Sequence, residues 1–502
     1  FLFLSRPRHL YPPSFFDKTQ QILRDAGCSL QEYEWPDRWF FDDERVLRKA
    51  AEEEKEKKAT PSSSSSSSAR DRDVSRVQDL FASVAEEEEA SDAAAAAAAA
   101  DHTKEDISAR QWMNKRGLTS KRQQDIAEAC FANDFGASLD ALGLRELVVE
   151  NQEWDVGEAY YVPDAPLSEL VKALEARVPR GCVRKSWPVS RVEVVSGAAA
   201  VRRELSSSSS SGVASNPPRQ IVKLTGPHGR VVLAKRVVVA LPLAVLKASL
   251  LSARRSSPSS FPSPSSSSPH PSPLPSSLIQ FSPPLSAAKL AAMERLLVGN
   301  AIKVILSFSK PFWPEDFFDA LCPGCFVPEF WVKSPPAKKH FNNNSDGSSN
   351  SSSSDASSLS PHVVTGFLCG RFAQEAQALG EEETVMRALE QLDEMFQGGG
   401  ERNTTSPASD SLVASRVVDW SRDPWALGAY SHPSLGAQRG DRRALASPES
   451  GGALFFAGEA THEAVNPCLQ AAIETGQRAA KEVLLAEEEE EEKMTMVRRS
   501  KL

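Results

Sequence analysis

Apolar and polar residues alternate along the chain with two periods, which predict helices and strands in turn. The helical period covers 120–134, 165–177, 286–297, 382–396 and 467–485. Period-two alternation or short apolar runs predict strands at 186–195, 221–224, 230–240, 300–308, 363–370, 412–420 and 453–457. The turn sequence Gly226-Pro227-His228-Gly229 joins two of these strands and predicts a hairpin. Alternating strands and helices indicate an α/β or α+β fold.

Two of the predicted strands have unusual compositions. The first, Val237-Val238-Val239-Ala240-Leu241, is a continuous apolar run, which is typical of a strand covered on both faces. The second carries Lys303 among apolar residues, on the same face as Ala301 and Ile305. A buried lysine is costly unless it has a partner. Lys303 is therefore either a functional residue or an edge residue whose side chain reaches water.

Low-complexity runs interrupt this pattern. Serine-rich runs lie at 62–68, 206–211, 256–277 and 348–354, and an alanine run lies at 93–100. Such runs bury too little apolar surface to offset the conformational entropy of the chain. We expect disordered segments at 46–101 and 335–360 and a Ser/Pro-rich linker at 251–278. Roughly 300–350 residues are left to fold, which is enough for one or two domains.

Charge and cysteine content exclude several classes of protein. The net charge of −9 is accounted for by the acidic runs Glu86–Glu89 and Glu487–Glu492, so no basic face for nucleic acid is expected. The longest apolar run, Val237–Leu246, is too short to span a bilayer. Seven cysteines without regular spacing indicate a reducing compartment. The single pair Cys322-Pro323-Gly324-Cys325 predicts no metal site, although a redox dithiol is an alternative.

The most informative stretch is the strand Leu454-Phe455-Phe456-Ala457 followed by Gly458 and Glu459. A helix is predicted within about ten residues, and helix N-termini attract anions and electron-rich carbonyls. Gly458 would allow close backbone approach, and Glu459 could accept hydrogen bonds from ribityl hydroxyls. The same residues equally fit a plain strand-turn-helix with a solvated glutamate.

Four blocks in order resemble the flavin-containing amine oxidases, a family that includes polyamine oxidases, monoamine oxidases and lysine-specific histone demethylases. They are Val189–Leu246, Ile279–Trp313, Trp420–Ser431 and Phe456–Thr461 with the helix that follows. The resemblance implies an FAD-binding Rossmann-like domain, incomplete at its N-terminus and interleaved with a mixed-sheet substrate domain. It assigns 180–250 and 411–485 to FAD binding, 102–179 and 279–396 to the substrate domain, 1–45 to a residual N-terminal segment and 486–502 to an acidic tail.

The resemblance also implies roles for individual residues. Lys303 would hold a water against the flavin N5, which ties it to flavin reoxidation and imine handling, and burial would lower its pKa. Tyr430 would form one wall of an aromatic slot for the substrate amine, and Cys468 replaces the second aromatic wall. The expected cofactor-binding residues are Val189, Trp420, Gly458, Glu459, Gln470 and Ala471.

One family feature is not found in the chain. A Gly-x-Gly-x-x-Gly turn seats the FAD pyrophosphate in this family, and no such run occurs in the sequence. Because the sequence starts at Phe1 rather than Met, we expect that its natural beginning is missing. The alternative is a flavin-free remnant that keeps the fold without activity.

The function implied is FAD-dependent oxidation of spermine, spermidine or acetylated forms to an imine. Hydrolysis would then give an aldehyde and a shorter amine, with oxygen reduced to hydrogen peroxide. The final residues Ser500-Lys501-Leu502 match the tripeptide that the peroxisomal import receptor reads, so we expect a peroxisomal protein. A histone-lysine demethylase of the same superfamily is the alternative, but neither a nuclear address nor a chromatin-binding module is apparent.

Overall fold

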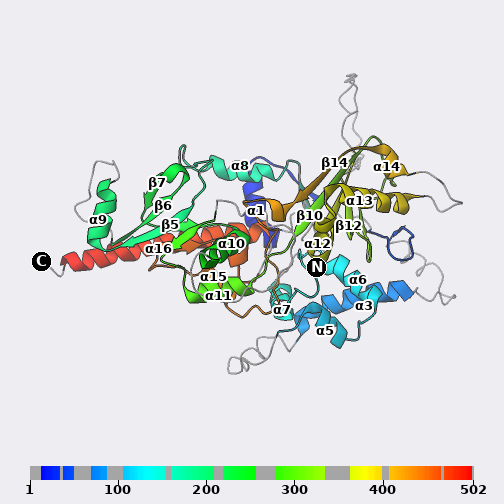
Figure 1. Ribbon diagram of the computed structural model, residues 1–502, viewed down its shortest axis with the longest axis horizontal. Helices are drawn as coiled ribbons and strands as arrows, with labels where there is room; N and C mark the ends of the chain where they lie inside the picture. Colours follow the sequence, from blue (N-terminus) through cyan, green and yellow to red (C-terminus); the bar gives the residue numbers. More distant parts are fainter. Residues whose placement is uncertain are drawn as a thin grey trace, which may run out of the picture.

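The computed structural model describes ten ranges of the chain: 13–33, 38–49, 69–87, 106–153, 160–207, 219–255, 278–333, 362–397, 406–464 and 468–499. Within these ranges the strands form four sheets, of seven, four, two and two strands. The sheet of seven strands lies in one half of the molecule and the sheet of four in the other (Figure 1). The predicted α/β architecture is therefore confirmed.

The largest sheet, called the large sheet below, is built around three long antiparallel strands. Helices α12 (Gly370–Leu379) and α13 (Glu381–Phe396) cover one face. Alternate residues such as Ile302, Val304 and Leu306 form the core beneath them. The strand order is β14 (Leu412–Asp419), β10 (Ala301–Phe308), β13 (His362–Cys369), β12 (Glu329–Lys333), β11 (Asp319–Leu321), β2 (Trp39–Phe40) and β3 (Arg48–Lys49).

A helical layer lies beside the large sheet (Figure 1). Two of its helices begin with capping boxes, Ser108 with Gln111 and Ser120 with Gln123, as expected where a serine precedes the first turn. The layer comprises α3 (Ala69–Ala82), the 3-10 turn η1 (Val84–Glu86), α5 (Ala109–Lys115), α6 (Lys121–Ala127), the π-helical turn η3 (Glu128–Ala132) and α7 (Leu144–Glu153).

The expectation of disorder across 46–101 is wrong for residues 69–87. There α3 and η1 bury Val77, Phe81 and Val84, and Phe81 stacks on Phe131 at 4.0 Å between ring centres. The apolar residues recur at helical spacing between the serine and alanine runs, so a helix forms and packs.

The other half of the molecule combines the four-stranded sheet with a parallel strand pair. The sheet order is β7 (Val231–Ala234), β6 (Gln220–Thr225), β5 (Arg191–Ser196) and β9 (Gln280–Ser282), and the pair is β8 (Val237–Val239) with β15 (Leu454–Phe456). Helices α10 (Leu243–Arg255), α11 (Ala287–Arg295) and α15 (Asp441–Ala446) complete this half. Its core includes Val222, Val239, Leu296, Leu454 and Phe456.

The predicted hairpin forms between β6 and β7, with His228 in the left-handed region at φ 56°. The predicted strand 230–240, however, is two strands in different sheets, because β8 leaves the hairpin to pair with β15. The expectation that the run Val237–Leu241 is covered on both faces is also wrong, since Val238 is 41% exposed. A continuous apolar run in the sequence does not show which other segments will pack against the two faces of the strand.

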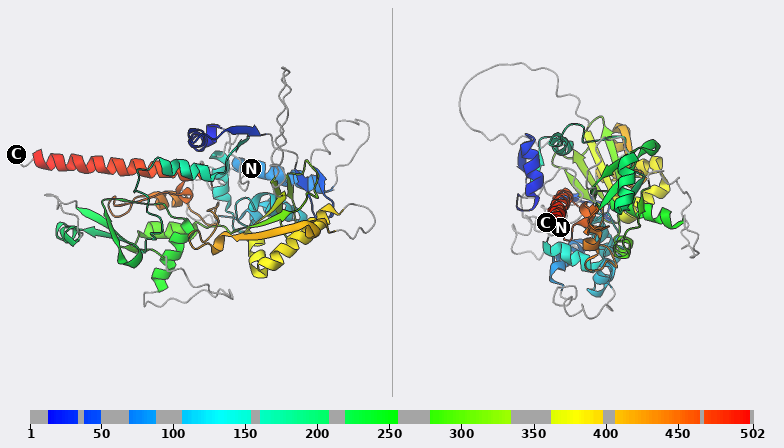
Figure 2. Two further views of the ribbon diagram at one scale, coloured as in Figure 1. Left: turned by 90° about the horizontal axis from the view of Figure 1, so that it is seen from above. Right: turned by 90° about the vertical axis from the view of Figure 1, so that its left-hand side faces the viewer.

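The last helix, α16 (Leu469–Arg499), extends beyond the predicted end at 485 through the acidic run. Arg236 holds this part of the helix by donating to Glu487 (2.7 Å), Glu490 (2.9 Å) and the carbonyl of Ala486 (2.8 Å). The helix projects from the body toward one end of the molecule (Figure 2). No helix within the described ranges is long and apolar enough to cross a bilayer.

The remaining elements are distributed over both halves of the molecule (Figure 1). Helix α1 (Pro13–Asp25) packs on α16 and on α8 (Ser168–Ala176). The other elements are the strand pair β1 (Leu30–Tyr33) with β4 (Tyr160–Pro163), helices α9 (Ala198–Ser207) and α14 (Pro407–Ser411), and the 3-10 turns η4 (Pro227–Gly229), η5 (Trp420–Arg422) and η6 (Glu459–Thr461).

The expected boundaries at 279 and 411 do not coincide with the sheets. Strand β9, on the substrate side of the first boundary, pairs with β5 in the four-stranded sheet. Strand β14, on the FAD side of the second boundary, pairs with β10 in the large sheet. The boundaries followed breaks in composition, whereas strand pairing connects segments across those breaks.

Candidate active site

Lys303 lies on β10, an internal strand of the large sheet next to the edge strand β14, on the face away from α12 and α13. Strand β10 has β13 on one side and β14 on the other, so the alternative that Lys303 is an edge residue is wrong. Its Nζ lies 5.5 Å from the ring centre of Trp331 and 5.6 Å from that of Phe367. Burial lowers the pKa of Lys303, and the neighbouring Cys369 and Glu329 partly oppose that shift. Lys303 can therefore lose its proton more readily than an exposed lysine.

Two aromatic rings form an apolar wall beside this lysine. Trp331 of β12 and Phe367 of β13 are buried and stack with ring centres 5.0 Å apart, at an interplanar angle of 29°. Sequence reasoning missed both. Side-chain alternation along β12 and β13 places Trp331 and Phe367 on the same face as Lys303, but only once the strand register is known.

Tyr430 is anchored next to this wall. Its hydroxyl donates to the carbonyl of Asp134 at 2.9 Å and lies beside the thiol of Cys369. A Cβ on Gly136 would come within 2.9 Å of the tyrosine ring, so the glycine lets the ring approach the backbone. Burial raises the pKa of Tyr430 well above its usual range, which keeps the phenol neutral. Its role as a wall of the substrate slot stays a prediction.

Glu459 lies at the turn after β15, where Gly458 has a φ of 125° that favours glycine. The carboxylate accepts from the backbone N–H of Ser431 (3.1 Å) and from its hydroxyl (2.6 Å). Ser431 in turn pairs with Val298, five residues before Lys303. Glu459 is thus linked through Ser431 to the segment that leads into the strand of Lys303.

A buried arginine links this turn to α7. Arg442 donates to both carboxylate oxygens of Glu146, at 2.8 and 3.1 Å, and to the hydroxyl of Ser431 at 3.1 Å. Glu150 lies one turn further along α7 and is 2% exposed, and neither of its carboxylate oxygens has a hydrogen-bond partner among the described residues. Burial raises the pKa of Glu150 well above its usual value, and Arg442 partly lowers it. Sequence reasoning missed this arginine and both α7 glutamates.

These residues fit the isoalloxazine and ribityl end of FAD. A carboxylate offers about four acceptor positions, and Glu459 uses two of them on Ser431, while Glu150 uses none within the described part of the chain. Such acceptors suit the hydroxyls of a ribityl chain. Trp420, in the turn η5 that contacts β10, is 42% exposed and offers a flat ring face. We expect Lys303, Trp420, Gly458 and Glu459 to hold that end of the cofactor.

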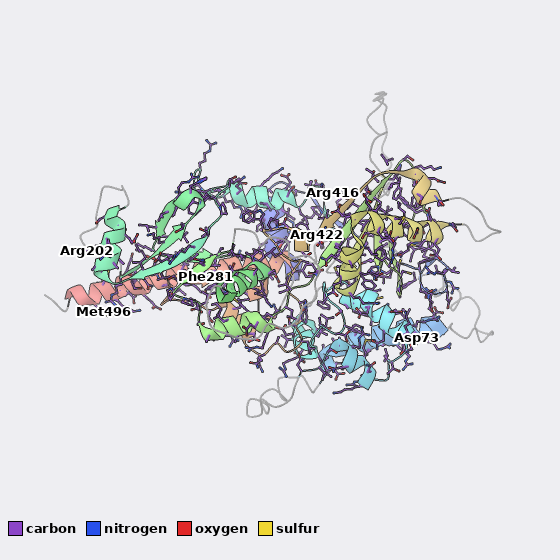
Figure 3. All side chains as sticks on the ribbon, viewed as in Figure 1. Asp73, Arg202, Phe281, Arg416, Arg422 and Met496 are labelled. Carbon is purple, nitrogen blue, oxygen red and sulfur yellow. The ribbon has the colours of Figure 1, made fainter. Side chains whose placement is uncertain are left out.

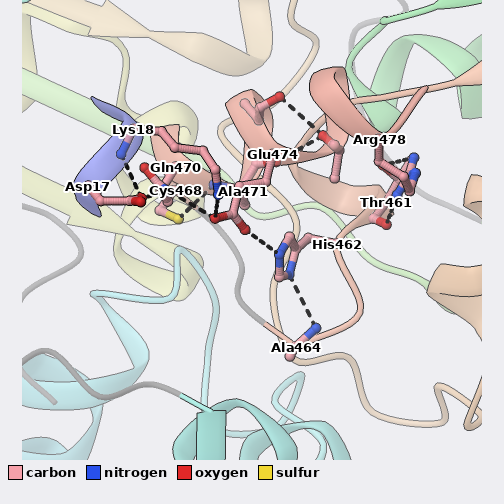
Figure 4. A network of polar contacts seen from close by, with 12 residues as sticks. Asp17, Lys18, Thr461, His462, Ala464, Cys468, Gln470, Ala471, Glu474 and Arg478 are labelled. Carbon is pink, nitrogen blue, oxygen red and sulfur yellow. Dashed lines mark hydrogen bonds and ion pairs between the residues drawn. The ribbon is translucent and has the colours of Figure 1, made fainter. Parts of the chain in front are cut away.

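Gln470 and Ala471 make internal contacts at the start of α16 (Figure 4). The side-chain oxygen of Gln470 accepts from the hydroxyl of Thr19 on α1 at 2.9 Å, and its amide donates to Glu474 at 2.8 Å. The Ala471 N–H donates to the sulfur of Cys468 at 3.3 Å. Their contact with FAD stays a prediction, and the structure gives the Gln470 side chain a structural role instead.

The other expected site residues lie apart from Lys303. Cys468 packs against the cluster formed by α1 and α8, and burial raises the pKa of its thiol to about 12. Val189 packs against the core beneath β8 and β15.

Cys325, of the Cys-x-x-Cys pair, has a pKa raised to about 12 by burial, which disfavours a reactive thiolate. Across the described ranges, no three potential ligands are grouped as a metal site would require.

Replacing Glu150 with leucine should stabilise the protein at pH 8 by about 1–3 kcal/mol, because an unpartnered buried carboxyl is removed. Since the pKa of Glu150 is higher in the folded protein, the folded state keeps a proton that the unfolded chain releases. Its contribution to stability therefore falls as pH rises above the unfolded pKa. Urea unfolding of the full chain at pH 8 and pH 4 measures this. An equal gain at both pH values would contradict the assignment.

Comparisons with known proteins show which family the chain belongs to. The family model described as flavin containing amine oxidoreductase matches residues 20–484. Human peroxisomal N(1)-acetyl-spermine/spermidine oxidase is 30% identical over 41% of this chain and 39% of its own length. An Arabidopsis thaliana protein, lysine-specific histone demethylase 1 homolog 3, is 32% identical over 41% of this chain and 11% of its own length. The match thus spans about two fifths of the human relative and a smaller share of the plant one.

Solved structures show the same fold. Putrescine oxidase bound to putrescine superposes with a TM-score of 0.61 at 16% identity, over 95% of this chain and 87% of that chain. Cyclohexylamine oxidase from Brevibacterium oxydans gives 0.61 at 16% identity, over 94% of this chain and 85% of that chain. Taken together with the family model, these likenesses establish that the chain belongs to the flavin-containing amine oxidoreductases, whose cofactor is FAD.

Proposed function

We propose that the protein oxidises polyamines, either spermine and spermidine or their acetylated forms. The product is an imine that hydrolyses to an aldehyde and a shorter amine, with release of hydrogen peroxide. Bound FAD would accept the hydride from the substrate and pass the electrons to oxygen. The observation that carries the proposal is the lysine with a lowered pKa against an aromatic wall, in a site connected to Glu459.

The residues on this face of the large sheet have complementary tasks. The stacked rings of Trp331 and Phe367 exclude water from the reacting carbon, and their π-faces attract a cationic amine. Lys303, beside the rings, holds a proton or a water at its Nζ. The exposed ring of Trp420, across β10 from β13, supports the flat ring of the cofactor.

We also propose a peroxisomal location. Ser500-Lys501-Leu502 lie outside the described residues, and the proposal rests on their match to the peroxisomal address. The human and bovine relatives are named peroxisomal oxidases, at 30% and 27% identity. An oxidase that releases peroxide suits a compartment that removes it.

An anaerobic substrate panel tests the reaction. The full chain is loaded with FAD and mixed with spermine, N1-acetylspermine, putrescine or cyclohexylamine, and loss of the oxidised-flavin absorption is followed. We expect the two longer amines to reduce the flavin fastest and to yield peroxide once oxygen is admitted. Stable flavin binding without reduction by any amine would contradict the proposal, and so would a preference for cyclohexylamine.

A histone demethylase is the second candidate, favoured by the 32% identity to the Arabidopsis homolog. It would act on an N-methylated lysine within a peptide. A dimethyl-lysine histone peptide added to the same panel separates the two reactions. Reduction by this peptide at a higher rate than by spermine would favour the demethylase.

A further inference from the structure

Three strands of the large sheet place an acid in line with Lys303. Lys303 of β10 is directly opposite Phe367 of β13, and Phe367 is directly opposite Glu329 of β12. Residues directly opposite in an antiparallel ladder project from the same face. Lys303 and Glu329 therefore share one face, two strand spacings or about 10 Å apart at the backbone, with the Phe367 ring between them.

Aromatic rings line the region between these two side chains. Glu329 is 1% exposed, and the stacked rings of Phe367 and Trp331 line the gap. Burial raises the pKa of Glu329 well above its usual range, Asp134 raises it further, and Arg38 lowers it. Charges in such an apolar setting interact more strongly than charges in water.

Several other ionisable groups lie around Lys303. They are Cys369 on β13, Arg416 on β14, Tyr430 with the carboxyl of Asp134 next to it, and Arg38, which is paired with Asp319 at 3.0 Å. Arg416 is exposed (Figure 3) and lies directly opposite Ile305, which shares the face of Lys303. Cys369 and Glu329 are the described groups that act on the charge of Lys303. Burial raises the pKa of the Cys369 thiol well above its usual value, so the thiol stays neutral. Glu329 is the carboxyl that acts on Lys303, and its ionisation, which burial opposes and Arg38 favours, would supply a compensating negative charge.

We propose that Glu329 is a positioning residue for Lys303, forming with it a buried carboxyl–amine pair across Phe367 that gains and loses charge together. The lysine is an ammonium while the carboxylate is present, and a free amine becomes favoured when the carboxyl takes up the proton. The pair is a property of the folded chain, and its use in catalysis rests on the proposed function.

Amine labelling of the full chain tests the pair directly. Acetic anhydride reacts with the unprotonated amine, and mass spectrometry gives the pH midpoint for modification of Lys303. Because a nearby carboxylate favours the ammonium, Glu329→Gln should lower this midpoint by about one pH unit. Glu329→Asp, which keeps a carboxyl, should restore part of the shift. The matched control is Glu390→Gln, an exposed position on α13 across the sheet, which should leave the midpoint unchanged.

A reciprocal measurement covers the case in which Glu329→Gln fails to fold. In Lys303→Met, Glu329 keeps Arg38 but loses the amine across Phe367. Its reaction with a carbodiimide, which needs the protonated carboxyl, should therefore persist to higher pH. The proposal would be overturned if the pH midpoint for modification of Lys303 were unchanged in folded Glu329→Gln. It would also be overturned if the pH range of the Glu329 reaction were unchanged in Lys303→Met. Both readouts are independent of flavin and substrate. A protein that shows the shifts but oxidises no amine would refute the proposed function and leave the pair intact.

Discussion

Lys303→Met is expected to slow flavin reoxidation by about 100-fold or more, the size of effect typical for loss of a positioned proton-transfer group. Methionine keeps the length of the side chain and suits the apolar surroundings of Trp331 and Phe367, so the fold should persist. What is lost is the nitrogen, whose pKa is lowered by burial, so that it gives up a proton more readily than an exposed lysine.

Stopped-flow mixing of the reduced, FAD-loaded full chain with oxygenated buffer measures this rate. Lys310→Met is the control, because Lys310 is exposed in the turn directly after β10. We expect the control to reoxidise like the parent protein. If folded Lys303→Met were reoxidised at the parent's rate, Lys303 would have no role in flavin reoxidation.

Arg442→Leu should destabilise the protein by about 3–5 kcal/mol, because removing one partner of a buried ion pair leaves the other charge uncompensated. Arg442 bonds both oxygens of Glu146 and also the hydroxyl of Ser431, which in turn bonds Glu459. Its loss removes the cation that acts on the carboxyls of Glu146, Glu150 and Glu459. We therefore expect weaker flavin binding as well as lower stability.

The neighbouring residue provides a matched control. Arg443 pairs with Glu463 at 2.7 Å, and both side chains are exposed to solvent, so Arg443→Leu should leave the unfolding midpoint almost unchanged. Urea unfolding and flavin fluorescence titration compare the two variants. Equal losses of stability and flavin affinity in both variants would show that the effect comes from disturbing helix α15 and not from breaking the buried ion pair. Adding Glu146→Leu to Arg442→Leu should recover part of the stability.

Local patterns predicted much of the large sheet. The strands expected at 300–308, 363–370 and 412–420 match β10, β13 and β14 to within one residue at each end. Alternation along one strand was enough to place Lys303 on the same face as Ala301 and Ile305, away from Ile302 and Val304. These features depend on side-chain periodicity within a single segment, which the sequence displays directly.

Features that depend on pairing between segments were missed or wrong. The run 230–240 could not be divided between two sheets until β15, more than 200 residues later, supplied a partner for β8. Arg442 resembled its neighbour Arg443 in the sequence, yet one is buried and the other exposed. The residues next to Trp331 and Phe367 in the sequence do not indicate that either ring lies beside Lys303.

The sequence by itself determined the long strands of the large sheet, the family and the face on which Lys303 lies, because periodicity and motifs depend on residues close together in the chain. The tertiary structure alone decided which groups surround that lysine. Phe367 and Glu329 reach it through strand register, and Arg442 reaches Glu146 across almost 300 residues of chain. Burial then shifts the pKa values of these groups, and burial is a property of the packed molecule rather than of any one segment.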